Sequence, residues 1–513
     1  MGVLDGLEPQ SVFHYFEEIS RIPHGSGNVR QISDYLKQFA ADHGLECIQD
    51  ELYNIIMIKE ATAGYEQAEP YILQGHMDMV AVSAPDCNID MTKDPLRLCV
   101  ENGRIHAQGT SLGGDDGIAV AYALALLDAD NISHPRLEVI LTVDEETGMD
   151  GAQGIDLSML RGRRLINLDQ EEEGVVITSC AGGARVDVRI PMTEASAAKP
   201  AAVQDAEEQE APKQEQQFFK LKVTGLLGGH SGIEINKGRG NANCLAGEIL
   251  KGLSERFRIQ LVTMRGGLAD NAIPREAEAV FAVDISLSEE VTDYVRKEEA
   301  RIRQELGDND PAFAAECSAW DQQKDTVNEK DSADETEKGI RYCDAASTAK
   351  ALACLCQLPN GVTAMSRELE GLVQTSLNLG VVTLEQGMLK LSYAVRSSVD
   401  EDREALCRQM QEIATQAGAS AEVRNAYTGW AYRKDSPLRD IIVEIYEKMY
   451  GRKPVLEAIH AGVECGILAA KIPGLDCVSI GPDMSDVHTA QESLDIASVK
   501  RMWEYLLAVL AYR

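Results

Sequence analysis

The sequence predicts an α/β fold in which a mixed, mostly parallel sheet is covered by helices and interrupted by an inserted α/β domain. Segments with strand character alternate with helical segments in the first 190 and the last 110 residues, roughly, as expected of a covered sheet. The chain also has 513 residues, more than one hydrophobic core usually supports. Two domains are therefore expected.

The chain begins with two predicted helices. Residues 8–22 have Pro9 near a helix start and apolar residues at helical spacing. Residues 26–43 repeat this pattern and end before Gly44, a residue that favours a helix end. These helices are expected to cover the sheet.

The strands of the predicted sheet follow. Residues 71–75 are typical of a short buried strand, and residues 104–108 are predicted to form a further strand before a glycine-rich loop. A helix is predicted over 118–128. Residues 137–143 and 165–168 are strongly strand-like, and each leads directly into acidic residues.

The pattern changes after Val186. Strand-rich segments at 218–223, 277–285 and 389–396 are typical of a second domain, and helix–strand alternation then returns with a strand at 475–480 and a helix at 497–510. We therefore predict a first domain made of residues 1–187 and 401–513. Residues 188–400 are predicted to form the inserted domain.

Composition excludes several classes of function. The formal net charge of −34 argues against nucleic-acid binding, which needs clustered Lys and Arg. Apolar runs such as 119–127 are too short to cross a bilayer, and the amino terminus lacks a signal-peptide pattern, so we expect a cytoplasmic protein. Two acidic, low-complexity stretches, 193–217 and 321–338, are predicted to be mobile surface insertions.

The twelve cysteines are dispersed along the chain, and no CxxC pair occurs. A closed zinc site of thiolates is therefore not indicated. We expect reduced cysteines that serve mainly as small core residues.

Five residues of metal-ligand type each fall where a predicted strand ends or the next element begins. They are His76, Asp115, Glu146, Asp169 and His488. Ligands bind at the carboxyl ends of the strands of an open α/β sheet, so these residues are expected to form one site. Imidazole nitrogen and carboxylate oxygen suit a catalytic zinc site that keeps a position open for water.

Two divalent ions could share this set. Asp115 would bridge them, with His76 and Asp169 completing one site and Glu146 and His488 the other. Three carboxylates and one hydroxide would neutralise the two cations. The sequence therefore favours a paired-metal hydrolase.

Two further acidic residues are expected to assist the metal site. Asp78 lies two residues after His76, on the same face of a strand, and is predicted to receive the imidazole proton and fix its tautomer. Glu145 precedes the predicted ligand Glu146, and we expect it to act as general base toward a metal-activated water.

Each of these residues has a simpler explanation when taken alone. A histidine at a strand end is more often a packing residue, and paired glutamates are commonly solvated. The glycine loop 113–117 also suggests phosphate binding, but it lacks the Lys and Ser or Thr of a P-loop and carries two acidic residues. A carboxylate ligand fits that loop better.

The residues singled out above lie in longer motifs. These are Gln74-Gly75-His76-Met77-Asp78-Met79-Val80, Gly109-Thr110-Ser111-Leu112-Gly113-Gly114-Asp115-Asp116-Gly117, Asp144-Glu145-Glu146-Thr147-Gly148, and the surroundings of Asp169 and His488. Taken together, they resemble the dinuclear zinc metallopeptidases of family M20. The chain looks most similar to the bacterial aminoacyl-histidine dipeptidases, also called Xaa-His dipeptidases or cytosolic non-specific dipeptidases, and the likeness extends over nearly its whole length.

The resemblance implies a zinc-peptidase catalytic domain interrupted by a smaller domain that serves as a lid and as a possible homodimer interface. It also implies two divalent ions, with Zn²⁺ expected and Co²⁺ or Mn²⁺ as alternatives, and a small peptide substrate. By the same likeness, His230 would stabilise the oxyanion. Asn271, Arg396 and His460 would contact the substrate, with Arg396 on its carboxylate.

The expected reaction is hydrolysis of dipeptides, including Xaa-His dipeptides such as β-alanyl-histidine, by a bridging water that Glu145 deprotonates. Lid closure would exclude bulk water and bring His230 into place. A tripeptidase or an acyl-amino-acid deacylase on the same scaffold is the alternative. A non-catalytic metal- or peptide-binding protein is the alternative from another class. The preferred dipeptides do not follow from the sequence.

Overall fold

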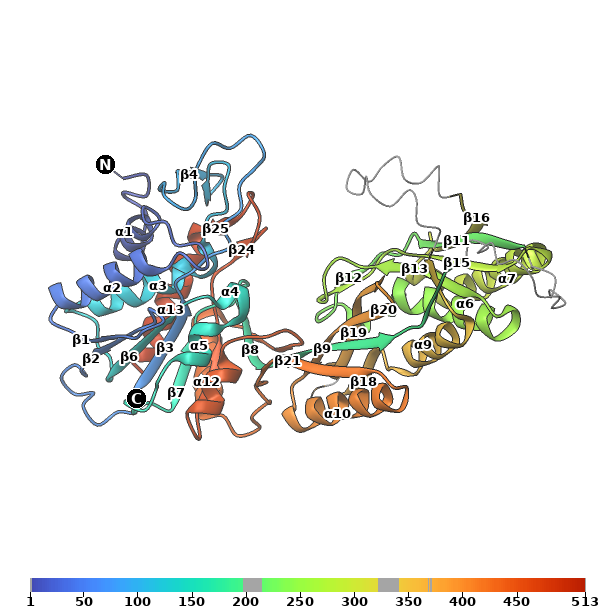
Figure 1. Cartoon of the computed structure of the whole chain (residues 1–513). Coiled ribbons are helices and arrows are strands. Elements are labelled where there is room, and N and C mark those ends of the chain that lie inside the picture. Colours follow the sequence, from blue (N-terminus) through green and yellow to red (C-terminus); the bar gives the residue numbers. More distant parts are fainter. Residues whose placement is uncertain (1, 197–214, 322–340, 368, 370, 513) are drawn as a thin grey trace, which may run out of the picture. The chain divides into compact units, whose positions relative to one another are not determined.

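The chain folds into two units in the computed structural model, which describes residues 2–196, 215–321, 341–367, 369 and 371–512. Unit 1 comprises Met1–Cys180 and Thr428–Arg513, and unit 2 comprises Ala181–Tyr427 (Figure 1). The two-part composition of unit 1 agrees with the prediction of an inserted domain.

An eight-stranded sheet forms the centre of unit 1, in the order β1-β2-β6-β3-β7-β23-β8-β22. Four neighbouring pairs are parallel, namely β6 with β3, β3 with β7, β7 with β23, and β8 with β22. The bounds of the strands are β1 Glu46–Gln49, β2 Ile55–Lys59, β3 Tyr71–His76, β6 Leu137–Thr142, β7 Arg164–Asn167, β8 Val175–Cys180, β22 Val455–Ile459 and β23 Asp476–Ser479. The fold class is the predicted one: a mixed sheet with a mostly parallel centre.

Helices cover this sheet because its central strands are rich in apolar residues and are buried on both faces. Leu73 and Ile166 pack into a core with the buried faces of five helices. These helices are α1 Gln10–Ile19, α2 Arg30–Asp42, α3 Gly114–Asp128, α11 Pro437–Tyr450 and α13 Ile496–Leu510. Three further helices of unit 1 are α4 Glu145–Gly148, α5 Asp150–Gly154 and α12 Cys465–Lys471, of which α12 packs against β23 and α5.

A small antiparallel sheet completes unit 1, in the order β24-β25-β5-β4. Its strands are β4 Leu98–Glu101, β5 Arg104–Ala107, β24 Met484–Ser485 and β25 Ser493–Asp495. The connection between β24 and β25 carries His488. This sheet therefore joins a carboxyl-terminal loop to an amino-terminal hairpin.

The predicted elements of unit 1 all occur, and their boundaries differ by a few residues. The second helix begins at Arg30 rather than at residue 26. Ser26 instead hydrogen-bonds the Asp78 carboxylate, and Gly25 pairs with Met79. Ser26 and Gly27 therefore form a turn before the helix, and contacts with Asp78 and Met79 hold it in place.

Unit 2 contains a nine-stranded sheet in the order β16-β11-β15-β13-β19-β20-β9-β21, with β18 paired to β19. Its strands are β9 Gly182–Pro191, β11 Gln216–Thr224, β13 Gln260–Gly266, β15 Ala277–Asp284, β16 Ala314–Ala319, β18 Gly361–Met365, β19 Val373–Glu385, β20 Met388–Ser397 and β21 Ser420–Tyr427. Two short pairs accompany it: β10 Glu194–Ser196 with β17 Arg341–Cys343, and β12 Gly229–His230 with β14 Ala272–Ile273.

Helices of unit 2 pack on its large sheet through a second apolar core (Figure 1). They are α6 Ala242–Phe257, α7 Ser288–Leu306, α9 Ala345–Gln357 and α10 Asp400–Gln416, with 3₁₀ turns η1 Ile235–Lys237, η2 Ile285–Leu287 and η3 Gly307–Asn309. Both α10 and β21 contact β9, so unit 2 continues to Tyr427, past the predicted boundary at residue 400. It also begins at Ala181, before the predicted residue 188, because β9 is one continuous strand.

Most of the two acidic stretches falls outside the described residues. The described ends of the first stretch belong to β10 and to the start of β11. All twelve cysteines carry free thiols, and six of them are buried, in agreement with the reduced state that was predicted. Among the described helices, none has both the length and the apolar character needed to span a membrane.

Candidate active site

Three neighbouring parallel strands bring acidic and histidine side chains to one edge of the unit 1 sheet. His76 is the last residue of β3, and its register partner on β6 is Thr142, shortly before Glu145 and Glu146. Asp169 follows β7 on the other side of β3. The carboxyl ends of these strands coincide, as the sequence predicted.

Asp115 and His488 reach the same place from other elements. Asp115 lies in the first turn of α3, and His488 lies in the loop after β24. The Oδ1 atom of Asp115 is 3.1 Å from His76 Nε2, and its Oδ2 atom is 3.1 Å from His488 Nε2. One carboxylate therefore faces two imidazoles, each through a different oxygen.

The remaining members of the predicted set lie beside these two imidazoles. Glu146 Oε1 is 3.0 Å from His488 Nε2, and Asp169 Oδ1 is 3.6 Å from His76 Nε2. The donor atoms of Asp115, Glu146 and His488 form one compact group of metal-ligand type. The structure thus brings together all five predicted residues.

The environment of His76 fixes its tautomer. This buried imidazole has Nδ1 2.9 Å from the backbone oxygen of Asp78, and the Asp78 carboxylate is 3.5 Å away. A carbonyl oxygen can only accept, so Nδ1 carries a proton, and Nε2 is the nitrogen that would bind a metal ion. Asp78 is thus the partner of the imidazole, as predicted, but its backbone oxygen lies closer to Nδ1 than its carboxylate does.

The Asp78 carboxylate instead holds the backbone of Glu145. Its Oδ1 accepts the N–H of Glu145 at 3.1 Å, and its Oδ2 accepts the hydroxyl of Ser26 at 2.8 Å. Glu145 itself is partly buried, and its carboxylate forms a group of metal-ligand type with His76 and Glu146. Asp78 therefore links the His76 strand to the α4 turn.

Burial and crowding of carboxylates shift the pKa values in this site. Burial raises the pKa of Asp169 to about 8 and raises that of Glu145 well above its ordinary value, with nearby carboxylates adding to both effects. Hydrogen bonds to Asp115 and Glu146 raise the pKa of His488 to about 11. Burial acts to raise the pKa of Asp115, but hydrogen bonds from His488 and His76 outweigh it and lower it.

Such a cluster fits divalent cations. Several carboxylates share a buried space in which their mutual repulsion is only partly relieved by two imidazoles. Nitrogen and oxygen donors of this kind suit zinc, and also cobalt or manganese. The donor set and the paired arrangement around Asp115 therefore agree with two metal positions.

Asp116 is a buried acid next to the site that the sequence analysis did not assign. Its Oδ2 accepts the backbone N–H of His76 at 3.3 Å, and Oδ1 is buried without a hydrogen-bond partner among the described residues. Burial raises its pKa well above the ordinary value, and the charge of Asp169 adds to this shift. Its adjacency to Asp115 in sequence was the available signal.

A group of buried polar residues, which the sequence analysis did not predict, lies beside the metal-ligand residues on the same strands. Glu464 is fully buried, and its Oε2 accepts hydrogen bonds from Gln74 at 2.5 Å and from Thr142 at 2.6 Å. Asn167 donates to Gln74 at 2.7 Å. Gln74 and Asn167 precede His76 and Asp169 by two residues, so strand periodicity places them on the same face.

His230 and Asn271 lie in unit 2. The Nδ1 atom of His230 accepts the N–H groups of Gly232 at 3.2 Å and Ile233 at 3.3 Å, so the ring proton resides on Nε2. Burial lowers the pKa of His230, and Arg396 lowers it further, which favours the neutral ring. The backbone oxygen of Asn271 accepts the N–H of Ser231 at 2.8 Å.

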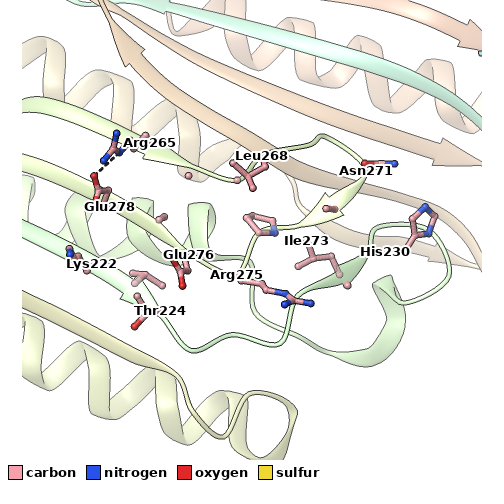
Figure 2. Close-up of a pocket in the computed structure, with 17 residues that line it drawn as sticks. Lys222, Thr224, His230, Arg265, Leu268, Asn271, Ile273, Arg275, Glu276 and Glu278 are labelled. Atoms are coloured by element: carbon pink, nitrogen blue, oxygen red, sulfur yellow. Dashed lines mark hydrogen bonds and ion pairs between the residues drawn. The ribbon is translucent and has the colours of Figure 1, made fainter. Parts of the chain in front are cut away.

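Figure 2 shows His230 and Asn271 at one end of a pocket within unit 2. The pocket has a volume of about 870 Å³ and is lined by β11, β13, β14 and β15. Ile273 and Leu268 are among its apolar residues. The neutral imidazole thus stands at the border of a cavity large enough for a small peptide.

Arg396 and His460 occupy different units. Arg396 lies near the end of β20, and its Nε atom is buried without a hydrogen-bond partner among the residues that the structure describes. This leaves it able to bind an anion. His460 is buried directly after β22 in unit 1, four residues before Glu464.

The chain is similar in sequence to known proteins over most of its length. The model of a family described as peptidase family M20/M25/M40 matches residues 72–512. The cytosol non-specific dipeptidase of Escherichia coli (strain K12) is 35% identical over 510 residues, which cover 99% of each chain.

Solved structures give a corresponding result. The crystal structure of aminoacylhistidine dipeptidase from Vibrio alginolyticus has a TM-score of 0.87 and 33% identity, covering 99% of this chain and 97% of the other. Aminopeptidase PepT from Bacillus cereus ATCC 10987 has a TM-score of 0.58 and 15% identity over 98% of each chain. The second likeness concerns the fold alone.

Proposed function

Because the chain belongs to peptidase family M20/M25/M40, we propose that it hydrolyses the peptide bond of dipeptides with two divalent metal ions. Its substrates would include Xaa-His dipeptides such as β-alanyl-histidine. The full-length likeness to a cytosol non-specific dipeptidase and to an aminoacylhistidine dipeptidase supports this proposal. The observation that carries it is the Asp115 carboxylate, which faces His76 and His488 at 3.1 Å each.

Asp115 would be the ligand shared by the two ions. His76 and Asp169 would complete one coordination sphere, and Glu146 and His488 the other. When bound, such ions polarise a carbonyl group and lower the pKa of a coordinated water, here one bridging them, to about 7. Zinc is the proposed metal, since the ligands are imidazoles and carboxylates.

Glu145 is proposed as the general base. Its carboxylate lies with His76 and Glu146 in one group, yet it is left over when the ligands are divided between two ions. Burial raises its pKa, which makes it a stronger proton acceptor than an exposed glutamate. Glu145 would take a proton from the attacking water and pass it to the leaving amine.

Unit 2 would supply groups that recognise the substrate. His230 carries its proton on Nε2 and would donate it in a hydrogen bond to the carbonyl oxygen as negative charge develops there. Arg396 would bind the substrate carboxylate, and Asn271 and His460 would contact the peptide. We also propose that unit 2 acts as a lid and forms a homodimer interface.

A cytoplasmic location also belongs to this proposal, since one relative is named a cytosol dipeptidase. The formal net charge of −34 agrees with a small-peptide substrate rather than with a nucleic-acid partner.

The test is hydrolysis by chelator-stripped protein before and after zinc is restored. The panel contains β-alanyl-histidine, several α-dipeptides, a tripeptide and an N-acyl amino acid. Zinc-dependent cleavage of the dipeptides alone is expected. Cleavage of only the tripeptide or the acyl compound would assign the chain to a sister activity. Zinc binding without any hydrolysis would favour a binding protein.

A further inference from the structure

The Glu492 carboxylate is buried against the loop that carries Asp115. The residue is 3% exposed and lies between β24 and β25. It accepts four backbone hydrogen bonds: Oε2 from Leu112 at 2.8 Å and Gly113 at 3.1 Å, and Oε1 from Gly114 at 2.7 Å and Asp115 at 3.3 Å. One side chain thus holds four consecutive N–H groups.

These bonds satisfy the backbone of the loop that leads into α3. Asp115 and Asp116 have non-helical backbone angles, so this loop is not part of a regular helix. Buried N–H groups need acceptors, and Glu492 supplies one for each of the four. Gly113 has a φ of +68°, and a Cβ on Gly114 would lie 3.2 Å from Glu492 Oε1. Gly113 therefore permits the left-handed turn of this loop, and Gly114 leaves room for the carboxylate to approach the backbone closely.

The same bonds connect two distant parts of the proposed metal site. Glu492 follows His488 by four residues, and His488 Nε2 is 3.1 Å from Asp115 Oδ2. Asp115 is therefore joined to this carboxyl-terminal segment twice. His488 contacts its side chain, and Glu492 holds its backbone.

We propose that Glu492 is a positioning residue that fixes Asp115 between His76 and His488, and thereby sets how tightly the metal pair binds. The inference rests on the proposed function, because it takes Asp115 as the shared ligand. Glu492 contacts the backbone that carries Asp115, and its effect on the metals is exerted through that residue.

Zinc affinity is the direct measurement. Full-length, chelator-stripped protein is titrated with Zn²⁺ against a fluorescent chelator. The variant Glu492→Gln keeps the shape of the side chain, but its amide nitrogen cannot accept the N–H groups that one carboxylate oxygen now accepts. Zinc binding is expected to weaken about tenfold or more, in the range seen when a group that orients a metal ligand is removed.

Glu138→Gln is the matched control. Glu138 is also a fully buried carboxylate of unit 1, and its Oε2 accepts the N–H groups of Arg161 at 3.0 Å and Gly162 at 2.9 Å. It lies near the amino end of β6, whereas the metal residues follow the carboxyl end. Glu138→Gln is expected to lower the melting temperature while zinc affinity stays within about twofold of wild type.

Two results would overturn the proposal. One is wild-type zinc affinity in Glu492→Gln, and the other is an equal loss of affinity in Glu492→Gln and Glu138→Gln. If Glu492→Gln does not fold, Gly114→Ala replaces it, because the added Cβ would displace the carboxylate. A severalfold loss of zinc affinity is then expected, and an unchanged affinity would reject the role.

Zinc binding also separates this inference from the proposed function. Wild-type protein that binds zinc but cleaves no dipeptide would reject the dipeptidase activity alone, and the affinities of the variants would still decide the role of Glu492. Wild-type protein that binds no zinc would reject both.

Discussion

The backbone N–H of Glu145 donates a hydrogen bond to the Asp78 carboxylate at 3.1 Å. Because Ser26 donates to the other oxygen of the same carboxylate at 2.8 Å, Asp78 is held in one orientation. The backbone of the proposed base is thereby tied to the strand that carries His76. Asp78 is expected to affect catalysis through the position of Glu145 as well as through the imidazole.

Asp78→Ala is expected to lower kcat for dipeptide hydrolysis about 10- to 100-fold, the range typical of groups that orient a metal site. Zinc content measured by atomic spectroscopy should remain near the wild-type value. Ser26→Ala serves as the control, because it removes one hydrogen bond and leaves the carboxylate. A loss of kcat in Ser26→Ala as large as in Asp78→Ala would contradict this role.

Glu145→Gln tests the general base. The amide cannot accept a proton from water, so kcat should fall by about 10²- to 10⁴-fold while both zinc ions remain bound. Single-turnover rates and zinc content, measured on the same preparation, separate chemistry from metal binding. Turnover equal to wild type would remove Glu145 as the base.

Zinc stoichiometry tests whether Asp115 is shared. Asp115→Ala removes a ligand from both proposed ions and is expected to abolish stable binding of the pair. Glu146→Ala removes a ligand from one ion and should leave the other in place. Equilibrium dialysis followed by metal analysis measures both variants, and equal stoichiometry in the two would reject a bridging position.

Much of unit 1 could be predicted because its strands and helices follow from the pattern of apolar residues within short segments. The strand over 71–76 begins with three apolar residues, and the acidic turn after β6 follows a mostly apolar strand. The carboxyl ends of parallel strands meet at one edge of a sheet, so His76, Glu146 and Asp169 could be assigned to one site before any coordinates were known.

Contacts between distant residues could not be predicted in the same way. Glu464 reaches Gln74 across 390 positions, and Glu492 reaches Leu112 across 380. A glutamate in a loop is usually solvated, and nothing in the neighbouring residues marks these two as buried. The carboxyl-terminal boundary of unit 2 could not be predicted for the same reason. It depends on the pairing of β21 with β9, and Arg189 on β9 contacts Glu422 on β21, 233 positions away.

His230 is expected to contribute to the chemical step. His230→Ala removes the Nε2 donor, and kcat should fall by about 10²- to 10³-fold, as when one oxyanion donor is lost. KM should change much less. Ile233→Ala is the control, since Ile233 is 56% exposed and its hydrogen bond to His230 comes from the backbone N–H, which the substitution keeps. If His230→Ala raised KM and left kcat unchanged, the residue would bind substrate without stabilising the transition state.

The buried carboxyl of Glu464 predicts how stability depends on pH. Burial raises the pKa of Glu464 from 4.5 to about 7. In this interval the folded protein holds a proton that the unfolded chain has released, so stability falls as pH rises from about 4.5 through 7. A shift of this size corresponds to roughly 3 kcal/mol.

Glu464→Gln removes this titration and keeps an oxygen that can accept from Gln74 and Thr142. The melting temperatures of chelator-stripped wild type and variant are compared at pH 5 and pH 8. The wild type should lose more stability than Glu464→Gln between these values, because only the wild type must ionise a buried group. Since the other titrating groups are common to both proteins, identical losses would mean that Glu464 stays ionised in the folded state throughout this range.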